Sequence, residues 1–330
     1  MKILVTGAAG FLGTRLIQAL LAGARDLPAV TALVAADLAP CPVDDARIDS
    51  RAGSIADPDF VRAIVDPDVD VVYHLAAVLS GQSEAEFDVG MRVNVDGTRA
   101  LLEACRALKT APRVVFTSSI AVFGAPLPRV VPDDLAPRPR TSYGAAKLIG
   151  EVLVNDYSRR GFIDGLSLRL PTVAIRPGRP NSALSSFVSG IVREPLAGIE
   201  AVCPVPDDTP LWICSPDTVT GNLVHAARLE TAALEGDRTV NLPGLSVTPA
   251  EMLASLERLG GAEARARVRC EPDPVAMRVV CAWPGAFEVS RPLRLGFTPE
   301  GDIDAIVGQF LRERAGGAGA RNSEHVQKEP

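Results

Sequence analysis

Residues 1–13 read MKILVTGAAGFLG, a β-branched run followed at once by the glycine spacing GxxGxxG. Gly7 suits the tight turn after a strand, Gly10 lets backbone N–H groups approach a pyrophosphate, and Gly13 lets a helix pack closely on the strand. The N-terminus of that helix carries about half a positive charge, which stabilises phosphate. The stretch therefore predicts a dinucleotide-binding turn. Its candidate contact residues are Gly7, Gly10, Phe11, Leu12 and Gly13.

The rest of the first half alternates short apolar runs with longer amphipathic segments, in the order βαβαβ. The runs that predict strands are Lys2–Thr6, Val30–Ala36, Val69–Ala76, Arg113–Ser118 and Gly165–Leu170. The segments that predict helices are Phe11–Ala24, Pro58–Val65, Glu84–Leu108 and Ser142–Arg160. Such alternation favours parallel strands, right-handed crossovers and helices on both faces. The expected fold is α/β, a Rossmann-type doubly wound parallel sheet that binds its ligand at the carboxyl ends of the strands.

The composition of the chain changes after Arg176. Pro-rich pieces such as RPGRPN and CPVPDDTPLW separate short periodic segments at 219–230 and 248–259. We expect an NAD-binding domain over 1–176, to which 217–245 return, and a smaller substrate lobe formed by 177–216 and 246–314. Residues 315–330 offer little to bury, and they are expected to form a flexible tail.

Composition excludes several classes of protein. The formal net charge is −6 and the acidic residues are spread along the chain, so no basic surface is expected to bind nucleic acid. No apolar run reaches the roughly 20 residues needed to cross a bilayer. The N-terminus becomes Gly-rich after six residues, too early for a secretory signal.

The six cysteines are far apart and include no CxxC pair, which argues against a zinc knuckle or a disulfide framework. We expect reduced thiols in the cytoplasm. His74 and His225 have no partner at metal-ligand spacing, so no metal is indicated.

Asp37 ends the second expected strand. A carboxylate there can accept both ribose hydroxyl protons of an adenosine and would repel a 2′-phosphate, so NAD is favoured over NADP. The offset of 30 residues from Gly7 exceeds the usual ~20, and we assign the excess to the loop that precedes the strand.

The catalytic candidates are Tyr143 and Lys147, in SYGAAK on an expected helix. Four residues apart on a helix places both side chains on one face, with Cβ atoms about 6 Å apart. At an effective dielectric of about 20, an ammonium at that distance favours phenolate by roughly 3 kcal/mol, or about two pKa units. Ser119, at the end of an expected strand, offers a hydroxyl that can hold the substrate oxygen against the phenol.

These residues together resemble the extended short-chain dehydrogenase/reductase family, whose members include nucleotide-sugar epimerases and sugar-acid dehydrogenases. The resemblance covers about residues 1–260. It rests on six features together: TGAAGFLG, Asp37, HLAA at 74–77, NVDGT at 94–98, TSSIAVFG at 117–124, and YGAAK at 143–147.

The resemblance implies a role for each matching position. Tyr143 would be the general acid/base, Lys147 would bind the nicotinamide ribose and lower the tyrosine pKa, and Ser119 would orient the substrate. Asn94 would hold the long helix and a proton-relay water. Further cofactor contacts would come from Ser54, Ile55, Ala76, Leu79, Thr117, Pro171 and Thr172. One departure is that Gly53 is followed by Ser54, where the family often has Asp, and this puts the adenine contact in doubt.

Within the family, the pattern RPGRPNSALSSFVSG, REPLAG, AVCPVP and LWICSP in the second half resembles a sugar-acid dehydrogenase, and this resemblance implies NAD-dependent oxidation of a small sugar acid by hydride transfer from C2. Arg176 and Arg179 follow the last cofactor strand, and a fork of N–H donors suits a carboxylate. Arg179, Asn181 and Ser80 are the candidate substrate contacts, with Ser119 and Tyr143.

Two other functions stay open at this point. One is a nucleotide-sugar 4-epimerase or dehydratase that keeps NAD bound. The other is a non-catalytic dinucleotide sensor, which would have no need for both Tyr143 and Lys147. Apolar residues on more than one face of the Ser142–Arg160 helix, such as Ile149, Val152 and Leu153, indicate a homodimer.

Overall fold

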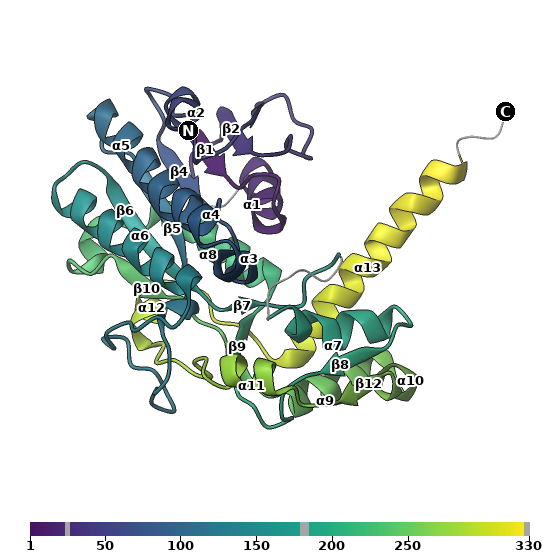
Figure 1. Ribbon diagram of the computed structural model, residues 1–330. Helices are drawn as coiled ribbons and strands as arrows, with labels where there is room; N and C mark the ends of the chain where they lie inside the picture. The colour runs from purple at the N-terminus through teal and green to yellow at the C-terminus, as the bar shows by residue number, and fades with distance from the viewer. Residues whose placement is uncertain (24–26, 179–184, 327–330) are drawn as a thin grey trace. The chain divides into compact units, whose positions relative to one another are not determined.

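The structure is a computed structural model of the chain and describes residues 1–23, 27–178 and 185–326 (Figure 1). The chain divides into two compact units. The first comprises Met1–Pro171, Asp217–Pro243 and Phe287–Pro299. The second comprises Thr172–Pro216, Gly244–Ala286 and Glu300–Pro330.

The first unit is built on a seven-stranded sheet in the order β10-β6-β5-β4-β1-β2-β3, with every pair parallel. The strands are β1 (Lys2–Thr6), β2 (Ala32–Asp37), β3 (Ile48–Ala52), β4 (Val71–His74), β5 (Arg113–Ser119), β6 (Asp164–Leu170) and β10 (Thr239–Asn241). Strand order reverses between β1 and β4, which places a ligand crevice at the carboxyl ends of these strands. The prediction of a doubly wound parallel sheet is confirmed.

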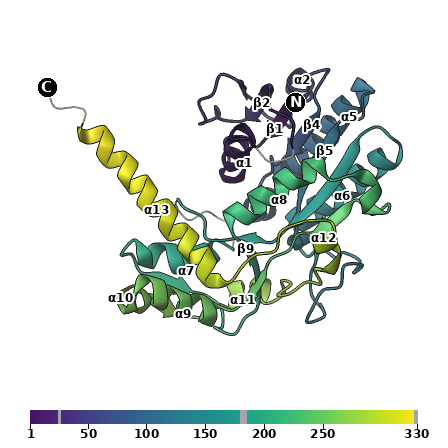
Figure 2. The ribbon, with the colours of Figure 1, turned by 180° about the vertical axis from the view of Figure 1, so that it is seen from behind.

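Helices cover both faces of this sheet (Figures 1 and 2). One face carries α2 (Pro58–Ile64), α5 (Thr98–Leu108) and α6 (Ser142–Arg159), whose apolar residues form one buried cluster with β1, β4 and β5. The other face carries α1 (Phe11–Leu21) and α8 (Pro216–Arg228), which are joined by an ion pair between Arg15 and Asp217. Short elements complete the unit: η2 (Ile120–Val122), η3 (Thr231–Leu234) and α12 (Ser290–Arg294).

The helix expected over 84–108 is not continuous. The structure has α3 (Ser80–Ala85), α4 (Phe87–Met91), a π-helical turn η1 (Arg92–Gly97) and then α5. A π-turn inserts one residue into the helical ladder, and such turns are frequent at functional sites. The backbone is helical from Phe87 to Leu108, so the prediction is confirmed there and was wrong at its start, where Glu86 separates α3 from α4.

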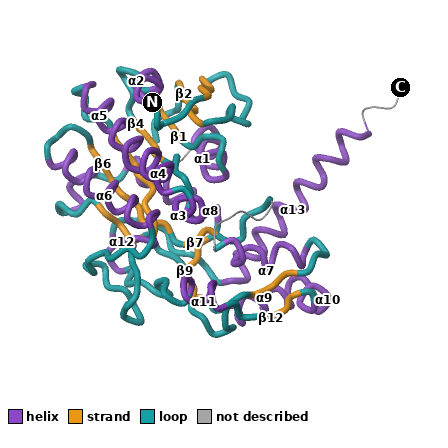
Figure 3. Tube along the Cα trace, in the orientation of Figure 1, coloured by secondary structure: helices purple, strands orange, loops and turns teal. Residues whose placement is uncertain are grey.

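The second unit contains a three-stranded sheet, a two-stranded sheet and a separate core (Figure 3). Its strands are β7 (Thr172–Val173), β8 (Ala201–Cys203), β9 (Leu211–Cys214), β11 (Leu245–Val247) and β12 (Val268–Cys270). Its helices are α7 (Ser186–Leu196), α9 (Pro249–Gly260), α10 (Ala262–Ala266), α11 (Pro274–Val280) and α13 (Ile303–Val326). Ile191, Ile213, Leu253 and Val307 are among its buried residues.

The boundaries of the two units along the chain differ from those expected from the sequence. Phe287–Pro299 belongs to the first unit, because the Glu288 N–H donates to the Val131 carbonyl and the Arg291 guanidinium donates to the Thr239 carbonyl at 2.7 Å. The segment from residue 315, expected as a tail, continues α13 to Val326. None of the helices in the described ranges is long and apolar enough to cross a membrane.

Candidate active site

The turn between β1 and α1 leaves no room for side chains at two of its glycines. Gly7 has φ +74°, and a Cβ there would lie 2.7 Å from the backbone nitrogen of Ala76. A Cβ on Gly13 would overlap the carbonyl oxygen of Gly7. Gly10 is the N-cap of α1, which begins at Phe11. The N–H groups at the start of this helix, including those of Phe11 and Leu12, have no partner within the helix and point toward the glycine turn. The turn therefore has the shape that a pyrophosphate requires.

Asp37 lies beside the glycine turn. Its Oδ2 accepts a hydrogen bond from the Ala9 N–H at 3.0 Å, and its Oδ1 accepts one from the Leu38 N–H at 2.6 Å. The carboxylate thus sits at the end of β2 and next to the turn, where the ribose of a dinucleotide is bound in doubly wound folds.

Ser54 and Ile55 lie just after β3, the strand that pairs with β2. The Ser54 hydroxyl accepts a hydrogen bond from the Ala56 N–H at 3.2 Å, which stabilises the turn before α2. Ile55 is buried, and Gly97 packs against it so closely that a Cβ on the glycine would lie 3.0 Å from the Ile55 carbonyl oxygen. The π-turn and the residues after β3 are therefore in direct contact.

Asn94 lies in the π-turn and holds the loop that follows β4. Its Nδ2 donates to the Val78 carbonyl at 3.0 Å, and its Oδ1 accepts from the Val78 N–H at 2.8 Å. These two hydrogen bonds fix the loop between Ala76 and Leu79, two positions expected to line the cofactor. The Asn94 carbonyl accepts from the Thr98 hydroxyl at 2.7 Å. Asn94 thus bonds to protein groups through both its side chain and its carbonyl, and its role toward a proton-relay water stays a prediction.

His74 is the centre of a buried hydrogen-bond chain. Thr98 donates its proton to the Asn94 carbonyl, so its oxygen accepts from His74 Nε2 at 2.9 Å. His74 Nδ1 then accepts from the Thr6 hydroxyl at 2.8 Å, which assigns the ring proton to Nε2. Burial, with a smaller contribution from Lys147, lowers the pKa of His74 to about 3, so the ring is neutral.

The catalytic candidates meet where β5 ends. Thr141 caps α6, its hydroxyl accepting from the Gly144 N–H at 3.0 Å, and Tyr143 is in the first turn of the helix. The Lys147 ammonium donates to the Thr117 carbonyl at 2.7 Å and lies 5.6 Å from the centre of the Tyr143 ring. Ser119, the last residue of β5, contacts the Tyr143 phenol.

Burial dominates the electrostatics of this pair. It raises the pKa of Tyr143 to about 12, and the contact with Ser119 opposes it. It lowers the pKa of Lys147 to about 8, and the negative charge of Glu151 opposes it. In the protein alone the phenol is therefore less acidic than usual, contrary to expectation. The physical reason is that the ammonium points at the Thr117 carbonyl, while the phenol loses water.

The expected substrate contacts are only partly described. Ser80 is the first residue of α3 and is half-buried. Arg179 and Asn181 lie outside the described residues. Arg176 lies in the second unit, where its backbone N–H donates to Ser189 Oγ at 3.1 Å and its carbonyl accepts from Arg193 at 2.8 Å. Burial lowers the pKa of its guanidinium. Pro171 ends the first unit, and Thr172 begins β7 in the second.

Sequence reasoning missed the polar groups behind the catalytic pair. Ser118, Glu151 and Arg169 are buried, and the carboxylate of Glu151 bonds to the other two. The detectable signal was spacing, because Tyr143, Lys147 and Glu151 are four residues apart and so share one face of a helix.

A family model described as the NAD dependent epimerase/dehydratase family matches residues 3–228. The chain belongs to this family. The match spans β1 to the end of α8, and it includes the glycine turn, Asp37 and the catalytic candidates of α6. The cofactor of this protein is accordingly a nicotinamide dinucleotide.

Similar proteins of this family match along nearly their whole length. A D-erythronate dehydrogenase from Cupriavidus necator is 49% identical over 319 residues, which cover 95% of this chain and 98% of that protein. A D-erythronate dehydrogenase from Haemophilus influenzae is 39% identical and covers 94% of this chain and 99% of that protein. A crystal structure described as a nucleoside-diphosphate-sugar epimerase from Agrobacterium tumefaciens has a TM-score of 0.92 at 43% identity, covering 96% of this chain and 95% of that one.

Proposed function

We propose that this protein is an NAD-dependent dehydrogenase that oxidises D-erythronate at its C2 hydroxyl to the 2-oxo acid. The observation that carries the reaction type is that one unit holds both the glycine turn with Asp37 and the group of Ser119, Tyr143 and Lys147. The substrate is inferred from the two relatives named D-erythronate dehydrogenase.

The residues present fit a nicotinamide dinucleotide. A side chain on Gly7 or Gly13 would collide with the backbone of the turn, so glycine keeps this turn tight, and Asp37 places a carboxylate beside it. When bound, the dinucleotide supplies the ring that accepts hydride from the alcohol carbon. The cofactor contacts that we propose in addition are Gly10, Phe11, Leu12, Ser54, Ile55, Ala76, Leu79, Thr117, Pro171 and Thr172.

Three side chains act on the substrate alcohol in this proposal. Ser119 hydrogen-bonds the C2 oxygen, and Tyr143, as phenolate, accepts the hydroxyl proton. Lys147 binds the nicotinamide ribose, and its positive charge favours the phenolate. Because burial raises the pKa of Tyr143 to about 12 in the protein without cofactor, the phenolate would gain at neutral pH from the further positive charge of an oxidised nicotinamide ring. Asn94 positions the cofactor loop.

The carboxylate of the substrate requires donors of its own. We propose Arg179, with Arg176 as the other candidate, and we propose Ser80 and Asn181 for the hydroxyl groups.

The direct test is purified protein with NAD and a panel of four- to six-carbon aldonates, followed by the absorbance of reduced nicotinamide. Steady formation of reduced nicotinamide with D-erythronate supports the proposal. No turnover of any aldonate would refute the assigned substrate class.

A second candidate is a nucleotide-sugar epimerase, because the Agrobacterium relative carries that description. This activity would convert a UDP-sugar without net formation of reduced nicotinamide. Chromatographic analysis of UDP-sugars incubated with the same protein preparation distinguishes the two.

We further propose that Asp37 selects NAD over NADP. Asp37→Ser removes the carboxylate that would repel a 2′-phosphate, so the ratio of kcat/KM for NADP to that for NAD is expected to rise about tenfold or more, or about 1.4 kcal/mol. Asp44→Asn, at an exposed acid of the following loop, is the control and should leave the ratio unchanged. A ratio equal to that of the wild type in Asp37→Ser would assign the preference elsewhere.

We also propose a homodimer that uses the outer face of α6. Val152 is 60% exposed and Ile149 is 39% exposed on this helix. Val152→Asp places a charge at the interface and is expected to weaken the dimer at least about tenfold, measured by light scattering across concentrations. Val202→Asp, in β8 of the other unit, should leave the dimer intact. A wild-type monomer, or an unaffected Val152→Asp dimer, would contradict this proposal.

A further inference from the structure

The carboxyl end of β5 contacts three successive turns of α6. Thr117–Ser119 make these contacts in order: a carbonyl oxygen to Lys147, a hydroxyl to Glu151, and a hydroxyl to Tyr143. Two of the three contacts involve the catalytic candidates. The third, from the Ser118 hydroxyl to the Glu151 carboxylate, contributes to the same register between strand and helix but has no role in the chemistry proposed above.

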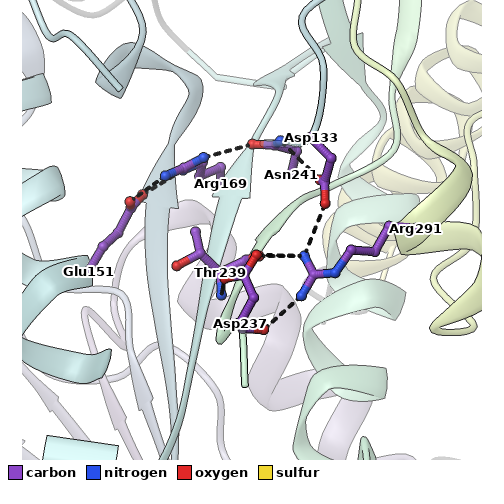
Figure 4. A network of polar contacts seen from close by, with 7 residues as sticks. All are labelled: Asp133, Glu151, Arg169, Asp237, Thr239, Asn241 and Arg291. Carbon is purple, nitrogen blue, oxygen red and sulfur yellow. Dashed lines mark hydrogen bonds and ion pairs between the residues drawn. The ribbon is translucent and has the colours of Figure 1, made fainter. Parts of the chain in front are cut away.

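Glu151 is the buried partner of an arginine. Its side chain is 4% exposed, and Arg169 on β6 donates two parallel hydrogen bonds to it, Nε to Oε1 at 2.9 Å and Nη2 to Oε2 at 2.7 Å (Figure 4). The guanidinium also lies 4.8 Å from the centre of the Phe123 ring. A bidentate pair of this kind adds directional hydrogen bonds to the charge pairing of the two side chains.

Lys147 is surrounded by groups from several elements. They are Tyr143 and Glu151 on α6, His74 on β4, and Phe116 and Thr117 on β5. Without the cofactor the histidine is neutral and the raised pKa of Tyr143 keeps the phenol protonated, so neither group compensates a buried ammonium. Arg169 on β6, which is paired with Glu151, is positive. Among the described residues, Glu151 is the carboxylate whose charge acts on Lys147.

We propose that Glu151 is a positioning residue of the active site, which fixes the turn of α6 that carries Lys147 against the end of β5 and places a buried negative charge one helical turn from the ammonium. Arg169 and Ser118 hold Glu151 in place for this task. The effect on turnover rests on the proposed function, whereas the effect on Lys147 itself does not.

A purely structural role is the competing explanation, because the same network extends away from the site. Arg169 Nη1 donates to Asn241 at 3.3 Å, and Asn241 in turn donates to Asp133 at 3.3 Å, which pairs with Arg291 (Figure 4). Asp133→Asn weakens this distant end and leaves Glu151 and its partners unchanged, so it is the matched control.

The chain is well suited to a direct measurement because it has only four lysines, Lys2, Lys109, Lys147 and Lys328. Protein labelled with ¹³C at lysine Cε gives few signals, and a Lys147→Met spectrum identifies the signal of Lys147. Titration of this signal in Glu151→Gln is expected to show a pKa about one pH unit or more below the wild-type value, a tenfold change in proton affinity. Asp133→Asn should match the wild type.

Glu151→Gln leaves the Arg169 charge unpaired and can fail to fold, so the double variant Glu151→Met with Arg169→Met is included. Replacing a buried ion pair by apolar side chains of similar volume is often neutral for stability. The pKa of Lys147 is again expected to fall in this variant. An unchanged Lys147 titration in Glu151→Gln or in the double variant would overturn the proposal, as would an equal fall in Asp133→Asn.

Activity gives a second readout. In the Glu151 variants the alkaline limb of the kcat/KM profile for D-erythronate is expected to move to lower pH, and in Asp133→Asn it should stay in place. If the wild type oxidises no aldonate, the proposed function fails, while the titration of Lys147 still decides the role of Glu151.

Discussion

Tyr143→Phe is expected to reduce kcat by about 10²- to 10⁴-fold, the usual contribution of a general acid/base, with little change in the Kd for NAD. The substitution removes one oxygen atom from a half-buried side chain and leaves α6 and its cap in place. Steady-state kinetics with D-erythronate and a fluorescence titration with NADH measure the two quantities separately.

The matched control for this prediction is Tyr157→Phe. Tyr157 is on the same helix, fourteen positions further along, and its hydroxyl donates to Glu103 on α5 away from the catalytic group. Its loss should leave kcat nearly unchanged. An equal loss of turnover and NAD affinity in Tyr143→Phe would show that the phenol supports binding or folding and would refute its assigned role.

Gly13→Ala is expected to weaken NAD binding by about fivefold to 150-fold, the range that corresponds to overpacking by about 1–3 kcal/mol. The added Cβ would overlap the Gly7 carbonyl oxygen, so α1 has to move away from the turn that approaches the pyrophosphate. Calorimetric titration with NAD measures the change.

Gly221→Ala provides the comparison for Gly13→Ala. Gly221 lies within α8, and no atom lies within 4 Å of the position of its added Cβ. Alanine in a helix interior is favoured over glycine by roughly 0.5–1 kcal/mol, so this variant should be at least as stable as the wild type and should bind NAD equally well. A Gly13→Ala protein with unchanged NAD affinity would contradict the proposed geometry of the turn.

Local features of the sequence led to correct predictions where the determining contacts are also local. The strand, turn and helix of residues 1–21 follow from apolar residues and glycine spacing within one short segment. The pairing of β2 beside β1 follows from the general rule for βαβ units. By contrast, β3 was not among the expected strands, because IDSRA is an edge strand with four exposed residues and carries no apolar pattern.

The electrostatic prediction for Tyr143 shows where spacing stops being sufficient. Four residues on a helix correctly placed Lys147 near the phenol ring, but they did not indicate which way the ammonium points. The direction is set by the Thr117 carbonyl, 30 positions earlier in the chain. The degree of burial, which controls the pKa of both groups, depends on how α6 packs on the sheet.

The sequence by itself determined the fold class, the glycine turn after β1 and the placement of Tyr143 and Lys147 on one face of a helix, because these are encoded in periodicity and spacing over fewer than about twenty residues. Only the tertiary structure decided the surroundings of this site: the neutral His74 between Thr6 and Thr98, the loop held by Asn94, and the buried Glu151 paired with Arg169. Such contacts join positions 16–68 residues apart, and their energies depend on burial, which exists only once the strands and helices have packed together.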